Sequence, residues 1–309
     1  MTLTAYQSLE YTPMKLLISL VLILPTLLAS SLYSTAAEAR ILVSNKPLAL
    51  IAAATYPTEQ IDILVPDGMS PHDYSLRPSD IGKIRQAEKI LWAGDQVEPF
   101  LAKFAAEVST TEDSGVGSKT EWLDATKLMQ EMKLYGSDPH VWLSPELAIA
   151  ISERITAWNP AVKESDIAQA KKDNQTFATD LTNLVASSKA QLAPLKGSGF
   201  FVFHQAYDYW FQAIDIQQLG AFTLSPERKP GVRHIQTMRN QLQNNEVSCI
   251  LSEPQFSPAL IKTVTNGLTI NQGELDPLAG RSVLTKSAYI DWLSDMTNTL
   301  ARCLKPAPK

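Results

Sequence analysis

Three of the four histidines lie where an expected secondary-structure element begins or ends. His72 lies in the loop 66–80, between a β-branched run and a helix start. His140 comes four residues before a second helix start, with Ser144 as its N-cap. His204 directly follows an apolar strand. Open α/β sheets bind their ligands beyond the carboxyl ends of the strands, so these positions favour a binding site.

The fourth histidine, His234, is flanked by Arg233 and Arg239 in a polar helical stretch, which is typical of a surface residue. For any one of the other three taken alone, a structural histidine is the commoner case. Three of them at element ends, in two separate halves of the chain, favour a shared site. Spacing alone does not show that they converge.

One carboxylate belongs with these histidines. Asp276 follows the last expected strand and precedes Pro277, which holds it on a loop. Imidazole nitrogens and one carboxylate oxygen suit a tetrahedral zinc site. We therefore predict a metal site, whose ligands are His72, His140, His204 and Asp276.

A zinc hydrolase is the enzymatic alternative, and it would keep a coordination position open for water beside a base. Glu253 is the only evident base near the expected strand ends. Direct ligation by Asp276 would close the site. We therefore expect a binding protein and not an enzyme.

The elements that position these residues form two blocks in which short apolar runs alternate with helical patterns, as in α/β folds with parallel sheets. Strands are expected near 41–43, 61–65 and 90–93 in the first block, and near 200–203, 216–219, 250–251 and 268–270 in the second.

Between the blocks, 164–192 carries apolar residues at three- and four-residue steps with no glycine or proline, which predicts one long helix. At 1.5 Å per residue it would span roughly 45 Å, enough to run along both lobes. A helix internal to one lobe is the alternative. We predict an N-terminal α/β lobe at 40–159, a linking helix at 160–194 and a C-terminal α/β lobe at 195–309.

Composition and charge limit the classes of partner that we expect for this protein. The chain has 309 residues, 45% hydrophobic content and a net charge of -5, which suits two packed domains. No Lys or Arg stripe is present, and Lys171 and Lys172 fit a solvated helix face. We expect no nucleic-acid partner.

Residues 1–39 resemble a cleavable signal peptide. Lys15 precedes the apolar stretch Leu16–Leu28, and Ala37-Glu38-Ala39 is an A-x-A cleavage site, so the mature chain would begin at Arg40. Translation could start at Met1 or at Met14. The apolar stretch is short for a bilayer span, so we expect export as a soluble protein.

Cys249 and Cys303 are the two cysteines of the chain, and neither has zinc-finger spacing. In an oxidising compartment the simplest outcome is a disulfide between them. Two unrelated buried thiols are the alternative.

Several stretches together resemble the periplasmic zinc-uptake proteins of bacterial ABC transporters, within the metal-binding solute-binding protein family. The resemblance runs from about Leu42 to the C-terminus. Its most specific stretches are His72–Asp80, Val141–Glu146, Phe201–His204, Glu253–Phe256 and Leu275–Leu278.

The resemblance implies two α/β lobes joined by one long helix, with Zn(II) held in the cleft by His72, His140 and His204. Asp276 or a water would take the fourth place. It further implies a periplasmic monomer that delivers zinc to the membrane permease, and a disulfide at Cys249 and Cys303. Manganese- and iron-carrying relatives tend to have glutamate at the position of His204, and imidazole is the softer donor.

A manganese or iron transporter component, or a metal-dependent adhesin, is the alternative within the family.

This chain departs from the family pattern in the loop that precedes His140, the second ligand. Many zinc members have a loop rich in histidine there, whereas 112–136 contains none. A low-affinity capture or sensing role is therefore not expected.

Overall fold

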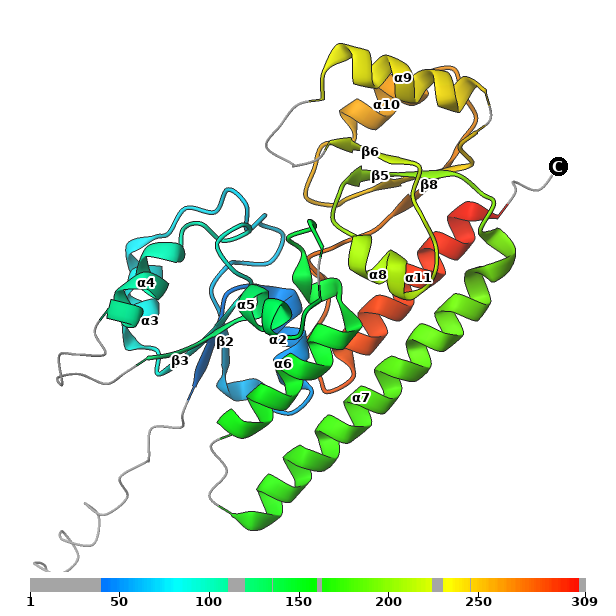
Figure 1. Ribbon diagram of the computed structural model, residues 1–309. Helices are drawn as coiled ribbons and strands as arrows, with labels where there is room; N and C mark the ends of the chain where they lie inside the picture. The colour runs from blue at the N-terminus through cyan, green and yellow to red at the C-terminus, as the bar shows by residue number, and fades with distance from the viewer. Residues whose placement is uncertain are drawn as a thin grey trace, which may run out of the picture. The chain divides into compact units, whose positions relative to one another are not determined.

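The computed structural model describes residues 40–110, 120–134, 136–159, 163–223, 230–244 and 246–305. The predicted signal peptide lies outside these residues. Within them, two four-stranded parallel sheets are each flanked by helices (Figure 1).

The first half supplies one sheet and its helices. Its elements are β1 (Ile41–Val43), α2 (Lys46–Ala53), β2 (Ile61–Ile63), α3 (Pro78–Gln86), β3 (Lys89–Trp92), α4 (Ala102–Thr110), β4 (Glu121–Asp124), α5 (Ala125–Glu131) and α6 (Pro145–Trp158). The strand order is β2-β1-β3-β4, with every pair parallel.

The second half repeats the arrangement. Its elements are α7 (Glu164–Leu192), β5 (Phe200–His204), α8 (Asp208–Ala213), β6 (Gly220–Thr223), α9 (Val232–Gln243), β7 (Cys249–Ser252), α10 (Ala259–Thr265), β8 (Asn271–Glu274) and α11 (Ala288–Leu304). The strand order β6-β5-β7-β8 matches that of the first sheet.

Alternation along the strands divides the apolar residues between the two faces of each sheet. Ile41 and Val43 on β1, with Phe200 and Val202 on β5, belong to one continuous core that includes residues of both halves. Leu42 lies in a separate cluster with Ile84 of α3, and Phe201 and Phe203 lie in a third cluster with residues of α9 and α10. The shared core stabilises the contact between the two lobes.

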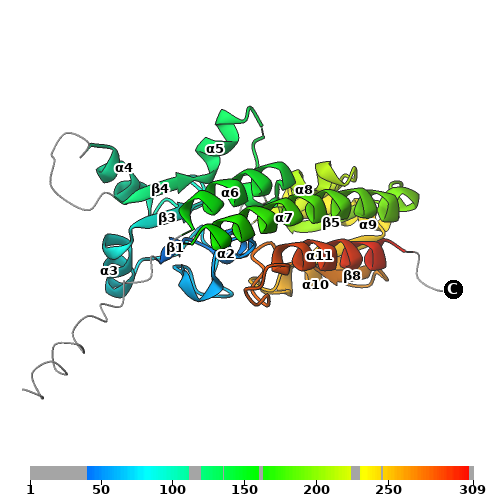
Figure 2. The same ribbon diagram turned by 90° about the horizontal axis from the view of Figure 1, so that it is seen from below.

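The predicted long helix is α7, whose 29 residues span roughly 44 Å. It packs against α6 and α11, and both views show it running beside α11 (Figures 1 and 2). Phe177, Leu181 and Leu192 join the shared core. Ile167, one of the apolar residues at helical spacing in 164–192, is 41% exposed.

Two predicted strands lie at other residues in the structure, and a third strand was not predicted. β6 lies at 220–223 rather than 216–219, because the chain still turns at Asp215 (φ 59°) and Ile216 packs into the core. β8 lies at 271–274 rather than 268–270, because Leu268 and Ile270 pack against the cluster under α9 and α10. β4 was not predicted, since its sequence mixes two charged residues with two apolar ones.

Candidate metal centre

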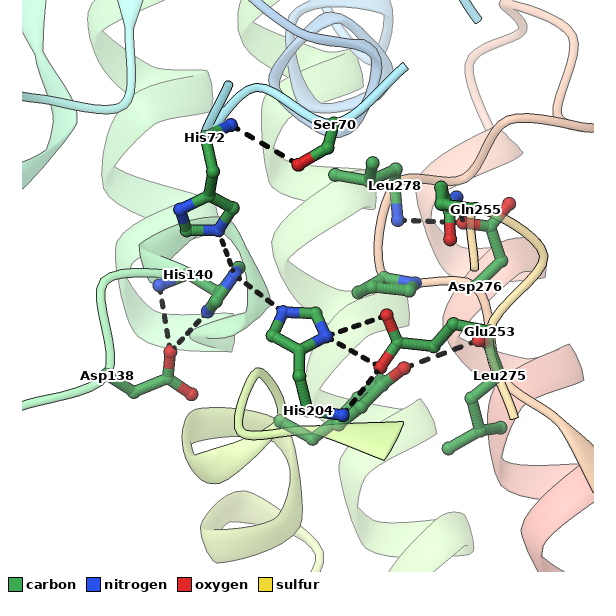
Figure 3. Close-up of polar contacts among 12 residues, drawn as sticks. Ser70, His72, Asp138, His140, His204, Glu253, Gln255, Leu275, Asp276 and Leu278 are labelled. Carbon is green, nitrogen blue, oxygen red and sulfur yellow. Dashed lines mark hydrogen bonds and ion pairs between the residues drawn. The ribbon is translucent and has the colours of Figure 1, made fainter. Parts of the chain in front are cut away.

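The three predicted histidines meet at one point (Figure 3). His72 Nε2 lies 3.0 Å from His140 Nε2, which lies 3.1 Å from His204 Nε2. His140 and His204 are 2% and 3% exposed, and His72 is half-buried. Within the described residues, this is the one group of three or more metal-ligating side chains whose ligand atoms lie within 4.8 Å of one another.

His72 lies on the loop between β2 and α3, and the start of α3 holds the end of that loop. Tyr74 Oη and the backbone N–H of Arg77 both donate to Asp80 Oδ2, each at 2.8 Å. Pro78 occupies the first turn of α3, a position that tolerates proline.

His140 precedes a short 3₁₀ turn and then α6. The Ser144 side chain accepts a hydrogen bond from the backbone N–H of Leu147, and Pro145 begins the helix, so the predicted cap is confirmed. The backbone N–H of His140 donates to Asp138 Oδ1 at 2.9 Å, which closes a tight local ring. The sequence between the two residues is a single proline.

His204 is the last residue of β5, and Glu253 directly follows β7, the strand that pairs with β5. Neighbouring parallel strands end at the same edge of a sheet, so residues separated by 49 positions lie in contact.

Two carboxylates determine which nitrogen each imidazole presents. His140 Nδ1 lies 2.6 Å from Asp138 Oδ1, and His204 Nδ1 lies 2.7 Å from both oxygens of Glu253. An ionised carboxylate only accepts hydrogen bonds, so each Nδ1 carries the proton. In the neutral imidazole each Nε2 then presents a lone pair, the arrangement typical of metal-ligating histidines.

Electrostatics supports an ionised Asp138. Burial alone would raise the pKa of this carboxyl, but the hydrogen bond from the His140 ring, with those from the backbone N–H groups of His140 and Asp208, holds its pKa below the ordinary value. The carboxylate therefore stays available to accept from the imidazole.

When both imidazoles are neutral and protonated at Nδ1, the Nε2 lone pairs of His140 and His204 face each other at 3.1 Å. Such a contact is repulsive unless a cation lies against both nitrogens. Tetrahedral Zn(II) with bonds of about 2.0–2.1 Å would hold its nitrogens roughly 3.3 Å apart, close to the separations seen here. Three neutral imidazoles suit zinc better than the harder manganese ion.

Asp276 is not part of this group. Its Oδ1 accepts from Gln255 Nε2 at 2.6 Å and from the Leu278 N–H at 3.0 Å, and its Oδ2 accepts from the Gly280 N–H at 2.7 Å. The assignment of Asp276 as a ligand stays a prediction.

The remaining sequence predictions can be placed as well. His234 is exposed on α9, where its Nε2 lies 2.8 Å from the carbonyl oxygen of Ala221. Cys249 of β7 and Cys303 of α11 form the predicted disulfide, with their Cα atoms 5.5 Å apart.

Asp138 and Glu253 are functional residues that the sequence reasoning missed. Asp138 stands two residues before His140, and Glu253 was considered only as a possible catalytic base. A strand order with β5 beside β7 would have placed Glu253 next to His204.

Comparison with known proteins decides the family. The model of the family described as zinc-uptake complex component A, periplasmic, matches residues 41–303. The chain belongs to this family. Its members are periplasmic solute-binding proteins of zinc transport, and solute-binding proteins of this kind are not enzymes.

Curated relatives agree. The high-affinity zinc uptake system protein ZnuA of Yersinia pestis is 35% identical, over 87% of this chain and 92% of the relative. The protein of the same name from Haemophilus ducreyi is 32% identical, over 88% and 95%.

A crystal structure of ZnuA, 20% identical, covers 86% of this chain and 100% of that chain with a TM-score of 0.67, which shows the same fold. Within the described residues, no helix is long and apolar enough to cross a membrane.

Proposed function

We propose that this chain captures Zn(II) through the Nε2 atoms of His72, His140 and His204 and delivers it to the permease of an ABC importer. The relatives that match it are named as zinc uptake proteins, which supports zinc as the transported ion. The protein would act in the periplasm as a monomer, after removal of residues 1–39, with lobes at 40–159 and 195–309 and a linking segment at 160–194.

One observation carries the proposal. Buried carboxylates place protons on Nδ1 of both His140 and His204, and the freed Nε2 atoms then converge with His72 Nε2. Burying two facing lone pairs on His140 and His204 costs stability unless a cation lies against them. The arrangement therefore favours metal capture over a structural role for these histidines.

The fourth coordination position would be filled by water in this conformation, because Asp276 already accepts three hydrogen bonds from the protein. Asp276 could replace that water only by exchanging those bonds. Catalysis is not proposed, since both buried carboxylates at the site, Asp138 and Glu253, are bound to imidazole N–H groups.

Metal analysis tests the proposal. Protein purified without added metal should take up one Zn(II) per chain, measured by titration against a competing chelator. A hundredfold excess of Mn(II) should leave the zinc in place. Displacement by Mn(II) at a comparable concentration would favour a manganese transporter instead, and uptake of no metal would contradict the site itself.

A further inference from the structure

One loop touches all three segments that carry the histidines. The 275–280 loop follows β8, and its carbonyl oxygens accept hydrogen bonds from two of these segments. Tyr207 Oη, three residues after His204, donates to Leu275 O at 3.3 Å. Trp142 Nε1, two residues after His140, donates to Pro277 O at 2.9 Å.

The third contact is with the loop of His72. A Cβ atom built on Gly280 would lie 3.6 Å from the backbone nitrogen of Gly68 and 4.0 Å from its Cα. Gly68 is four residues before His72, and the Ser70 side chain between them accepts from the His72 N–H. The backbone of Gly280 therefore lies against the His72 loop, with room for little more than a methyl group between them.

Asp276 holds the 275–280 loop in this shape (Figure 3). Its carboxylate accepts hydrogen bonds from the backbone N–H groups of Leu278 and Gly280, and these two bonds close the turn that follows Asp276. Gln255, two residues after Glu253, donates a hydrogen bond from its Nε2 to the same carboxylate. The carbonyl oxygen of Asp276 accepts from Trp292 Nε1 of α11 at 2.9 Å.

The turn needs such support because Ala279 has φ at 51°, in the left-handed region that disfavours an L side chain. Ala279 is also 2% exposed, so it cannot relax toward solvent. Strained residues of this kind persist where their surroundings hold them, and here the two bonds to Asp276 are on either side of Ala279.

We infer that Asp276 and Gln255 form a positioning pair: through the 275–280 loop they set the separation of the three histidines, and Asp276 does this as a hydrogen-bond acceptor and not as a zinc ligand. The inference rests on the proposed function, since it concerns the geometry of the same site. It assigns to the site a zinc ion with three imidazoles and one water.

If Asp276 were a zinc ligand, removal of the Gln255 side-chain amide would have the opposite effect on zinc affinity. A ligating Asp276 would have to leave Gln255, so removing the glutamine amide would free the carboxylate and strengthen zinc binding. A positioning Asp276 would lose a support, and zinc binding would weaken.

The test is Gln255→Ala against the matched control Gln272→Ala, which removes an exposed amide on β8. Zinc affinity is measured by chelator competition. We expect the zinc Kd of Gln255→Ala to rise about tenfold, the lower end for groups that orient metal ligands. The control should bind as the unsubstituted protein does. An equal or tighter affinity in Gln255→Ala would overturn the inference.

A second variant separates positioning from ligation. Asp276→Asn keeps one acceptor oxygen but places an amide where Gly280 needs an acceptor. With Co(II) as the probe, we expect weaker binding and an unchanged visible spectrum at saturation, because the metal keeps the same ligands. A shifted or weakened ligand-field band at saturation would identify Asp276 as a ligand and overturn the inference.

These outcomes are distinct from a failure of the proposed function. If the unsubstituted protein bound no zinc, the metal site would be wrong. If it bound one zinc and Gln255→Ala bound as tightly, the site would stand and only the positioning pair would fall.

Discussion

The two lobes place the same kind of polar pair at the same point of their sheets, and only one pair serves the metal centre. In the N-terminal lobe, Asn45 follows β1 and its Nδ2 donates to Glu98, which follows β3, at 2.8 Å. In the C-terminal lobe, His204 ends β5 and its Nδ1 donates to Glu253, which follows β7, at 2.7 Å. Both pairs lie where the strand order reverses, the position at which open α/β sheets bind ligands.

The difference lies in what the donor does with its other polar atom. Asn45 Oδ1 accepts from the Leu48 N–H and so caps α2. His204 Nε2 instead faces His140 Nε2 at the metal centre. The Asn45 amide bonds both to Glu98 and to the first turn of α2, so it serves packing within the lobe. The His204 imidazole is oriented by Glu253 at Nδ1 and presents Nε2 to the metal centre.

Removing the imidazole of the C-terminal pair should have the largest effect. We expect His204→Ala to weaken zinc binding by about a thousandfold or more, since zinc binding energy is shared among a few ligands. Chelator competition measures it, with the exposed His234→Ala as control. An undiminished affinity in His204→Ala would remove the basis for choosing zinc over manganese.

In the C-terminal lobe, the disulfide between Cys249 and Cys303 joins the sheet to α11. Reduction of the disulfide should lower the free energy of unfolding by about 4 kcal/mol in the chain-entropy model, given the sequence separation of 54 residues. Calorimetry with and without reductant would detect it as a lower melting temperature. Zinc affinity should change little, because Cys249 begins β7 and Glu253 follows its other end. Two titratable thiols in the unreduced, denatured protein would contradict the bond.

Neutralising Glu253 and Glu98 in separate variants distinguishes the roles of the two pairs in zinc binding. Glu253→Gln should weaken zinc binding by roughly ten- to hundredfold, because the neutral amide orients His204 without supporting its basicity. Glu98→Gln should leave zinc affinity unchanged, since Glu98 contacts Asn45 and the Ala93 N–H and no histidine. Similar losses of zinc affinity in the two variants would mean that the lobes are not functionally distinct.

The smallest effect concerns pH. Burial raises the pKa of Glu98 from its ordinary value of 4.5 to about 7, although hydrogen bonds from neighbouring groups oppose the shift. The folded state then binds more protons than the unfolded state between about pH 4.5 and 7. This contribution to stability is present below pH 4.5 and is lost as the pH rises through 7.

The contribution of Glu98 to the stability of metal-free protein should therefore grow by up to about 1.4 kcal/mol for each unit that the pH falls in this window. Glu98→Gln should remove that slope, which chemical denaturation at several pH values would measure. Zinc affinity should follow the opposite trend, because protons compete with the metal for imidazole. An identical slope in Glu98→Gln would exclude Glu98 as its source.

Much of this architecture could be predicted from the sequence because its causes are local. Periodicity located α7, and the Ser144-Pro145 pair located the start of α6. Polar edge strands gave weaker patterns. β4 and β8 lack an apolar run, and their positions are determined by pairing with β3 and β7.

The site was predictable in its histidines but not in its supports. His72, His140 and His204 stand at element ends, which local patterns can locate. Glu253 lies beside His204 only because β5 pairs with β7, and this pairing is not visible in a local pattern. Asp276 is held by Gln255 in the same way, through contacts that only the folded chain makes.

X-ray absorption at the zinc edge tests the central claim most directly, because it counts the imidazoles bound to the metal. Protein loaded with one Zn(II) per chain should give three imidazole nitrogens at about 2.0–2.1 Å and one oxygen, with no sulfur. His204→Ala, loaded at saturating zinc, should lose one imidazole. A spectrum with one imidazole or none, or one unchanged in His204→Ala, would contradict the three-histidine zinc site.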